Sequence, residues 1–202
     1  MPEGHAEAMK PIKVDPVARM VLNRTRRLIF KPQAFSFNRE TSEAQKVLVC
    51  MPADIDRFAM ARDLLSTFVG IFQGKRIFVF LPFLDAEGYL SDSAAYQVIA
   101  AARDDLNLLS LPGKEFVRRL KDLHFGISLD LDLEDGFFSC HLCARCGIPM
   151  RIGPKRKNAF PLYNIELEVL KDRFGSRETY EGLARTLKSL FTENTKAIAN
   201  PP

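Results

Sequence analysis

The chain has 202 residues, of which 47% are hydrophobic and 27% charged, and its formal net charge is +4. This composition is close to that of an average globular protein and excludes wholesale disorder. The longest strongly apolar stretch, 77–84, is far shorter than the ~20 residues of a membrane helix, and the N-terminus lacks the apolar core of a signal peptide. We therefore expect a soluble cytoplasmic domain, and the mild positive charge does not predict nucleic-acid binding.

Residues 1–46 are predicted to be a basic N-terminal extension and linker. Between positions 10 and 31 the chain has seven Lys or Arg and one acid, Asp15. Arginines interleave there with apolar residues, which predicts a short amphipathic helix that ends before Pro32 and lies on the main domain or on a membrane. Such basic runs are often only solvated. The sharper interpretation is contact with an anionic surface at the inner face of the membrane. A second basic cluster lies at 155–157. The residues predicted to make this contact are Arg24, Arg26, Arg27, Lys155, Arg156 and Lys157.

Residues 47–193 are predicted to form the main domain, followed by a tail at 194–202. Apolar runs at 47–51 and 76–81 are typical of strands buried on both faces, and apolar residues recur at helical spacing from 58 to 72. The later elements are expected as follows: a helix at 91–103, a strand at 106–110, a helix at 114–123, a strand at 126–131, a helix at 136–146, a strand at 149–152 and a helix at 176–191. Alternating strands and helices predict an α/β fold, with a mostly parallel sheet covered by helices on both faces.

Acidic residues follow two of the predicted strands, where the site of a parallel α/β sheet is expected. Asp54 and Asp56 come after the strand at 47–51, and Asp130 and Asp132 sit at and after the end of the strand at 126–131. An aspartate at a strand end can act as a general base, or it can simply cap the next helix. The turn after the first strand contains no glycine, so the dinucleotide-binding fingerprint is absent and no cofactor is predicted.

Three of the four cysteines, Cys140, Cys143 and Cys146, are spaced like ligands of an iron–sulfur cluster or of zinc. On a helix, however, Cys140 and Cys146 would lie about 9 Å apart along the axis. Sulfurs that share a zinc ion lie within about 4 Å of one another. The geometry therefore favours buried thiols that pack the helix onto the sheet, and a metal or redox site remains an alternative.

Several short motifs recur in an order and spacing that resemble a known family. They are the strand 47–52 with its acidic turn, the segment 74–82, the segment 127–131 followed by Gly136, the segment 147–153, and the tripeptide 162–164. From residue 46 to about 191 the chain resembles the N-terminal half of bacterial heptosyltransferases, the glycosyltransferase family nine enzymes of lipopolysaccharide synthesis. The resemblance implies a single Rossmann-like domain, one half of a GT-B architecture, which in the family holds the acceptor sugar.

The resemblance also implies a catalytic position. In the family, an aspartate that follows a glycine in the turn after the first strand is the proposed base for the acceptor hydroxyl, which attacks an ADP-sugar. Without a gap, Asp56 falls on the glycine and Arg57 on the aspartate. Arginine stays protonated and cannot be the base, so only a one-residue shift makes Asp56 the general base. The resemblance implies an acceptor-side cleft with Asp54, Arg57, Asp130 and Asp132.

The family's donor nucleotide binds mainly to a second domain, and 202 residues accommodate only one domain of this size. We therefore expect a glycosyltransferase-like domain that is non-catalytic alone and has a structural or protein-interaction role, with another chain or a second copy as partner. One alternative is the acceptor-binding subunit of a split ADP-sugar-dependent transferase that acts on lipopolysaccharide-type acceptors. The other is the metal or redox protein.

Overall fold

The fold is built on a six-stranded parallel sheet with the strand order β5-β3-β2-β6-β7-β8. The computed structural model describes residues 10–30, 36–84, 86, 89–134, 137–156, 161–169 and 176–199, with side chains placed up to 192. The strands are β2 (Lys46–Cys50), β3 (Arg76–Leu81), β5 (Gln97–Ala100), β6 (Ile127–Asp130), β7 (Met150–Pro154) and β8 (Ile165–Leu167). The predicted α/β class with a mostly parallel sheet is confirmed.

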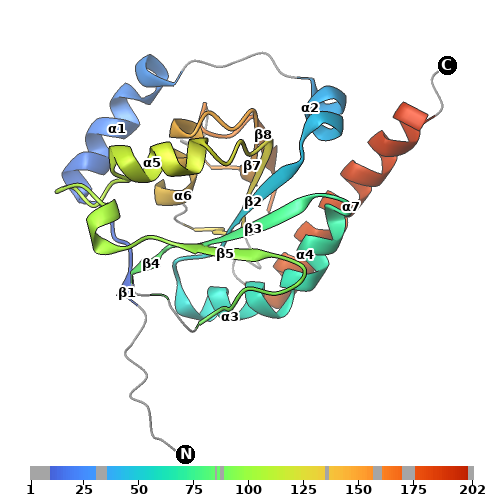
Figure 1. Ribbon diagram of the computed structural model, residues 1–202, viewed down its shortest axis with the longest axis horizontal. Helices are drawn as coiled ribbons and strands as arrows, with labels where there is room; N and C mark the ends of the chain where they lie inside the picture. The colour runs from blue at the N-terminus through green and yellow to red at the C-terminus, as the bar shows by residue number, and fades with distance from the viewer. Residues whose placement is uncertain are drawn as a thin grey trace, which may run out of the picture.

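Helices cover both faces of this sheet (Figure 1). Successive residues of a strand point to opposite sides, so one strand contributes side chains to the core on each face. Val47 and Val49 of β2 face a core with α3 (Ile55–Asp63), α4 (Leu65–Ile71) and α7 (Arg177–Ala199). Leu48 and Cys50 face the opposite core with α5 (Lys114–Lys121) and α6 (Phe137–Arg145). Because both faces of β2 are buried, its sequence is a continuous apolar run rather than an alternating one.

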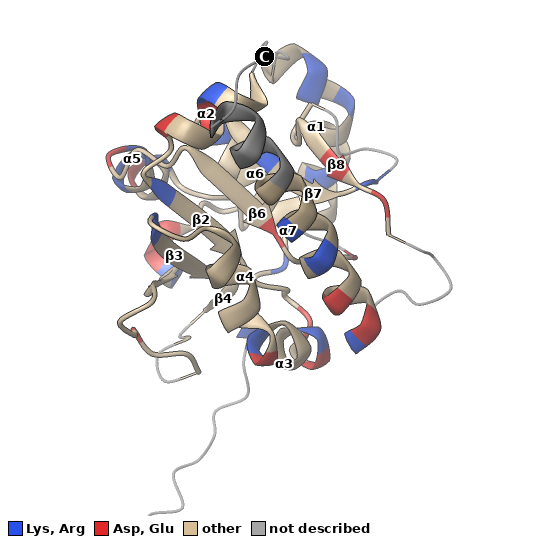
Figure 2. Ribbon diagram, turned by 90° about the vertical axis from the view of Figure 1, so that its right-hand side faces the viewer, with Lys and Arg blue, Asp and Glu red and all other residues tan. Residues whose placement is uncertain are grey.

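The N-terminal segment, predicted as an extension, packs onto this domain. Strand β1 (Lys10–Pro11) pairs antiparallel with β4 (Phe83–Leu84), and helix α1 (Pro16–Ile29) buries Ala18 against Leu111 and Phe137. The side chain of Asp15 caps α1 by accepting from the backbone N–H groups of residues 17 and 18 at 2.8 and 3.2 Å. Figure 2 shows blue bands and no red on α1, since this helix has four arginines and no acidic residue.

Several predicted elements differ from the structure. Helix α2 (Phe37–Glu43) lies where the sequence suggested a linker, and it packs on α7 through the rings of Phe37 and Phe191, 5.4 Å apart. The expected helix 58–72 divides into α3 and α4 at Leu64, and α7 continues beyond the predicted end of the domain.

Residues 91–110 are where the sequence prediction was wrong. The expected helix at 91–103 is replaced by strand β5, the edge strand beside β3, and by the short 3-10 turn η1 (Arg103–Asp105). The expected strand at 106–110 is a turn, in which the side chain of Asn107 accepts from the backbone N–H groups of Leu109 and Leu111. Within the described part of the chain, no helix has both the length and the apolar composition of a membrane span.

Candidate functional site

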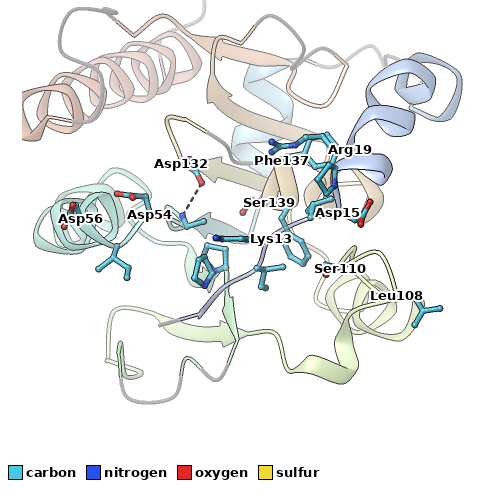
Figure 3. Close-up of a pocket in the computed structure, with 18 residues that line it drawn as sticks. Lys13, Asp15, Arg19, Asp54, Asp56, Leu108, Ser110, Asp132, Phe137 and Ser139 are labelled. Atoms are coloured by element: carbon cyan, nitrogen blue, oxygen red, sulfur yellow. Dashed lines mark hydrogen bonds between the residues drawn. The ribbon is translucent and has the colours of Figure 1, made fainter. Parts of the chain in front are cut away.

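A cavity of about 1030 Å³ opens at the carboxyl ends of β2, β3 and β6, at the edge where a parallel α/β sheet carries its site. The β2–α3 turn and the first residues of α6 form two of its sides (Figure 3). The N-terminal segment 11–16 and the turn at 108–110 close the others. Of the four residues predicted for an acceptor-side cleft, Asp54 and Asp132 line this cavity and Arg57 and Asp130 do not; Asp56, the predicted general base, also lines it.

The β2–α3 turn presents its charged side chains in three different ways. Asp54 caps α3, its carboxylate accepting from the backbone N–H of Arg57 at 3.0 Å. Asp56 is exposed in the first turn of α3, and in Figure 3 it lies at the outer edge of the lining residues. The half-buried guanidinium of Arg57 donates to Glu134 from the loop after β6. Arg57 therefore ties the turn to its neighbour instead of pointing freely into the cavity.

The carboxylates of Asp130 and Asp132, at and after the end of β6, are buried and satisfied by hydrogen bonds. Asp130 is 3% exposed, and its carboxylate accepts from the hydroxyl of Tyr163 and, at 2.9 Å, from the backbone N–H of Asp132. Asp132 in turn accepts from the backbone N–H groups of Ala53 and Glu134 at 3.2 and 3.1 Å. Burial raises the pKa of Asp130 to about 7 and also raises the pKa of Asp132. Asp130 therefore titrates near neutral pH behind the cavity wall.

Arg156 and Tyr163, which the sequence analysis did not assign to this site, complete the cluster of buried carboxylates. The guanidinium of Arg156 donates to the backbone carbonyl of Asp132 and lies 5.9 Å from the ring centre of Tyr163. Gly153 leaves the space that this ring occupies, because a Cβ there would lie 2.4 Å from the Tyr163 Cζ. Arg156 was among the residues predicted to contact an anionic surface, but its side chain turns inward, to the Asp132 carbonyl and the Tyr163 ring.

The other predicted surface cations also differ in their surroundings. Arg24 and Arg27 are exposed on α1, whereas Arg26 is 9% exposed and donates to Asn23 at 3.1 Å, so Arg26 does not offer its charge to a surface. Lys155 is exposed but pairs with Glu168 at 3.3 Å. Lys157 lies outside the described residues.

The cysteine cluster packs α6 onto the sheet. The thiols of Cys50 and Cys143 lie 3.7 Å apart between β2 and α6, and both residues are buried. Burial raises the pKa of Cys140 and of Cys146 to about 12, which disfavours the thiolate that a metal would need. Among the described residues, no group of three or more His, Cys, Asp or Glu is arranged to hold a metal ion, so the metal alternative finds no support there.

Comparison with known proteins supports the fold. No protein-family model and no curated protein sequence matches the chain. Among solved structures, E. coli ADP-heptose LPS heptosyltransferase II is similar, with a TM-score of 0.52 and 21% identity, over 69% of this chain and 40% of that one. The E. coli heptosyltransferase WaaC with ADP-2-deoxy-2-fluoro heptose has a TM-score of 0.51 and 14% identity, over 74% of this chain and 48% of that one.

These comparisons confirm the predicted resemblance at the level of the fold. The chain has the Rossmann-like α/β arrangement of a GT-B glycosyltransferase domain. It spans less than half the length of the two heptosyltransferases.

Proposed function

We propose that this chain is a carbohydrate-binding domain with a glycosyltransferase-like fold, and that it does not itself catalyse glycosyl transfer. The observation that carries the proposal is the ion pair of Arg57 with Glu134. This arginine occupies the position at which the resemblance expects the general base, and Glu134 holds its guanidinium by an ion pair. A guanidinium remains protonated and has no lone pair to accept the proton of an acceptor hydroxyl.

The carboxylates nearest to this position are engaged in holding the backbone. Asp54 caps α3, and Asp132 accepts from two backbone N–H groups. A general base has to reach the proton that it abstracts within hydrogen-bond distance. Asp56 is at the outer edge of the lining residues, which supports a binding role for the cavity rather than a catalytic one.

The chemistry of the lining favours a polyhydroxylated ligand over an anion. Four carboxylates line the cavity, those of Asp15, Asp54, Asp56 and Asp132. Only two cations, Lys13 and Arg19, oppose them among the described lining residues. Carboxylates accept hydrogen bonds from hydroxyl groups, and lysine and serine side chains donate back. Neutral sugars carry both functions on neighbouring carbons. The two heptosyltransferases that share the fold act on sugars, as their names state.

Isothermal titration calorimetry of the purified chain with neutral mono- and oligosaccharides tests the binding role. We expect saturable binding that Lys13→Gln weakens, because Figure 3 shows Lys13 among the side chains of the cavity. Lys188→Gln makes the same charge change on the exposed side of α7 and should leave binding unchanged. Absence of binding, or equal weakening by both variants, would contradict the proposed site.

The second candidate is the acceptor-binding part of a transferase with Asp56 as its base. Asp56 favours it in one respect, because its carboxylate is exposed and borders the cavity. This candidate predicts release of ADP from an ADP-sugar when a saccharide acceptor and a donor-binding chain are present, and loss of that release in Asp56→Asn. The non-catalytic proposal predicts no release with the wild-type chain or the variant.

A further inference from the structure

We propose that the outer face of α1 binds the surface of an anionic membrane. Here this face is called the α1 stripe, and it consists of Val17, Met20, Val21, Arg24, Arg27 and Leu28, all exposed. These positions follow one another at the three- and four-residue spacing of a single helix face. A surface helix of a globular protein normally exposes polar residues, whereas this helix exposes four apolar side chains and two arginines on one face.

The stripe concentrates the exposed apolar side chains of the molecule. Of the eight large hydrophobic residues that are well exposed in the described part, five lie on α1, and Val17 and Leu28 are 62% and 79% exposed. Scattered single residues of this kind are ordinary, whereas a contiguous apolar face marks an interaction surface. The inner face of α1 is buried through Ala18 and Arg26, and the exposed stripe lies on the opposite side of the helix.

A second apolar element lies beside the start of α1. The backbone N–H of Asp15 donates to the carbonyl of Leu109 at 3.2 Å, which fixes the 107–110 turn next to the helix. Leu108 in this turn is fully exposed and Leu109 is 44% exposed. Figure 1 shows α1 on the outside of the molecule, away from α7. The turn and the stripe therefore offer two neighbouring sets of apolar side chains.

The charges indicate which partner fits. Helix α1 contains four arginines and no acidic residue, and Arg24 and Arg27 sit among the apolar side chains of the stripe. Apolar side chains entering the headgroup boundary, with arginines facing lipid phosphates, are the features of an interfacial amphipathic helix. An anionic bilayer offers an apolar interior to the apolar side chains and lipid phosphates to the arginines. A second copy of this chain would bring four stripe arginines together, and their repulsion disfavours that occupant.

Flotation of the full chain with lipid vesicles tests the inference. The probes are phosphatidylcholine vesicles with and without phosphatidylglycerol. We expect binding only to the anionic vesicles, and weakening at high salt. Arg24→Gln with Arg27→Gln should weaken binding roughly 30-fold, since each basic side chain near an anionic surface contributes about a fivefold factor. Val17→Ser, Val21→Ser and Leu28→Ser together should weaken binding by at least about tenfold.

The matched control is Arg62→Gln with Arg185→Gln, which removes the same charge from the exposed surfaces of α3 and α7. It should bind like the wild type. Because the stripe side chains are exposed, all variants are expected to fold, which circular dichroism verifies. Equal binding to neutral and anionic vesicles would overturn the proposal, and so would binding that the stripe variants do not change. Dimers that light scattering detects and the serine variants dissolve would also overturn it, because a second copy would then occupy the stripe.

Discussion

Two acidic turns follow the neighbouring parallel strands β2 and β6, and the fold uses them in opposite ways. After β2, Asp54 and Asp56 are exposed; Asp54 caps α3, and Asp56 lies in its first turn. Asp130, the last residue of β6, and Asp132, which follows it, are each 3% exposed and form a hydrogen-bonded cluster with Tyr163. Acidic residues at the end of a buried strand therefore do not by themselves identify a reacting group; what covers the strand end decides their role.

The difference comes from the elements that follow each strand. At the β2 end, solvent reaches the carboxylates of Asp54, which caps α3, and of Asp56. The β6 end is covered by the segment after β7, from which Arg156 and Tyr163 reach back to Asp130 and Asp132. Removing water from a carboxylate disfavours its charged form, which is why the pKa of Asp130 rises to about 7. Substitutions in the two turns should separate these environments.

Asp130→Asn should give the largest effect, and the effect should depend on pH. Between about pH 4 and 7 the unfolded chain releases the Asp130 proton while the folded chain keeps it, so the free energy of unfolding falls as pH rises. Asparagine has no proton to release. Relative to wild type, the variant should therefore gain up to about 4 kcal/mol across this range, measured by urea unfolding at a series of pH values.

His141 also contributes to the pH dependence of the wild-type free energy of unfolding. Burial lowers the pKa of His141 to about 4, so its contribution to stability is present above about pH 6.5 and is lost as pH falls toward 4. The two groups therefore drive the wild-type curve in opposite directions, and the difference between Asp130→Asn and wild type isolates the carboxyl. A constant difference from pH 4 to 7 would contradict the burial argument.

Gly153→Ala should be the next largest effect, about 3 kcal/mol of lost stability. The added methyl group would meet three ring atoms of Tyr163 at 2.4 to 2.7 Å, and this ring is fully buried beside Asp130. Gly70→Ala in α4 is the matched control, since nothing lies within 4 Å of its Cβ position, and it should be neutral or slightly stabilising. Chemical denaturation compares the two; equal stability would show that the Tyr163 ring moves without cost.

Asp54→Ala should cost about 1 kcal/mol, because the backbone N–H of Arg57 loses its capping partner. The thermal unfolding midpoint reports this change. Replacement by serine, which also caps helices, should restore most of the loss. If serine and alanine were equivalent, the capping role of Asp54 would be wrong.

Asp56→Asn should be the smallest change, below about 0.5 kcal/mol, since an exposed acid in the first turn of α3 interacts only weakly with the helix dipole. Thermal unfolding measures it. A loss similar to that of Asp54→Ala would mean that Asp56 also holds the backbone of the turn, which the exposed position of its side chain does not suggest.

Much of the fold follows from residue patterns, and the failures have physical reasons. The strands at 47–51 and 76–81 were recognisable because burial on both faces requires continuous apolar runs. The edge strand β5 is only partly buried, so its sequence lacks that signal. The leucines at 106–111 have the apolar composition of a buried strand, but the side chain of Asn107 stabilises a turn there.

The site was predictable in position and not in its contacts. The order of elements indicated that Asp54, Asp56 and Asp132 would meet at one edge of the sheet, and they line one cavity. The hydrogen bond between Tyr163 and Asp130 joins residues that are 33 positions apart, and it depends on the path of the chain after β7. The inward turn of Arg156 has the same origin, and the spacing of charges in the sequence does not show it.

Whether the cavity binds a carbohydrate can be determined by NMR chemical-shift mapping of the isotope-labelled chain during titration with neutral saccharides. We expect shifts confined to amides around the cavity, above all those of Ala53, Asp56 and Ser139, and smaller shifts at the same saccharide concentration in Lys13→Gln. Shifts spread over other surfaces, or no shifts at saturating saccharide, would contradict it.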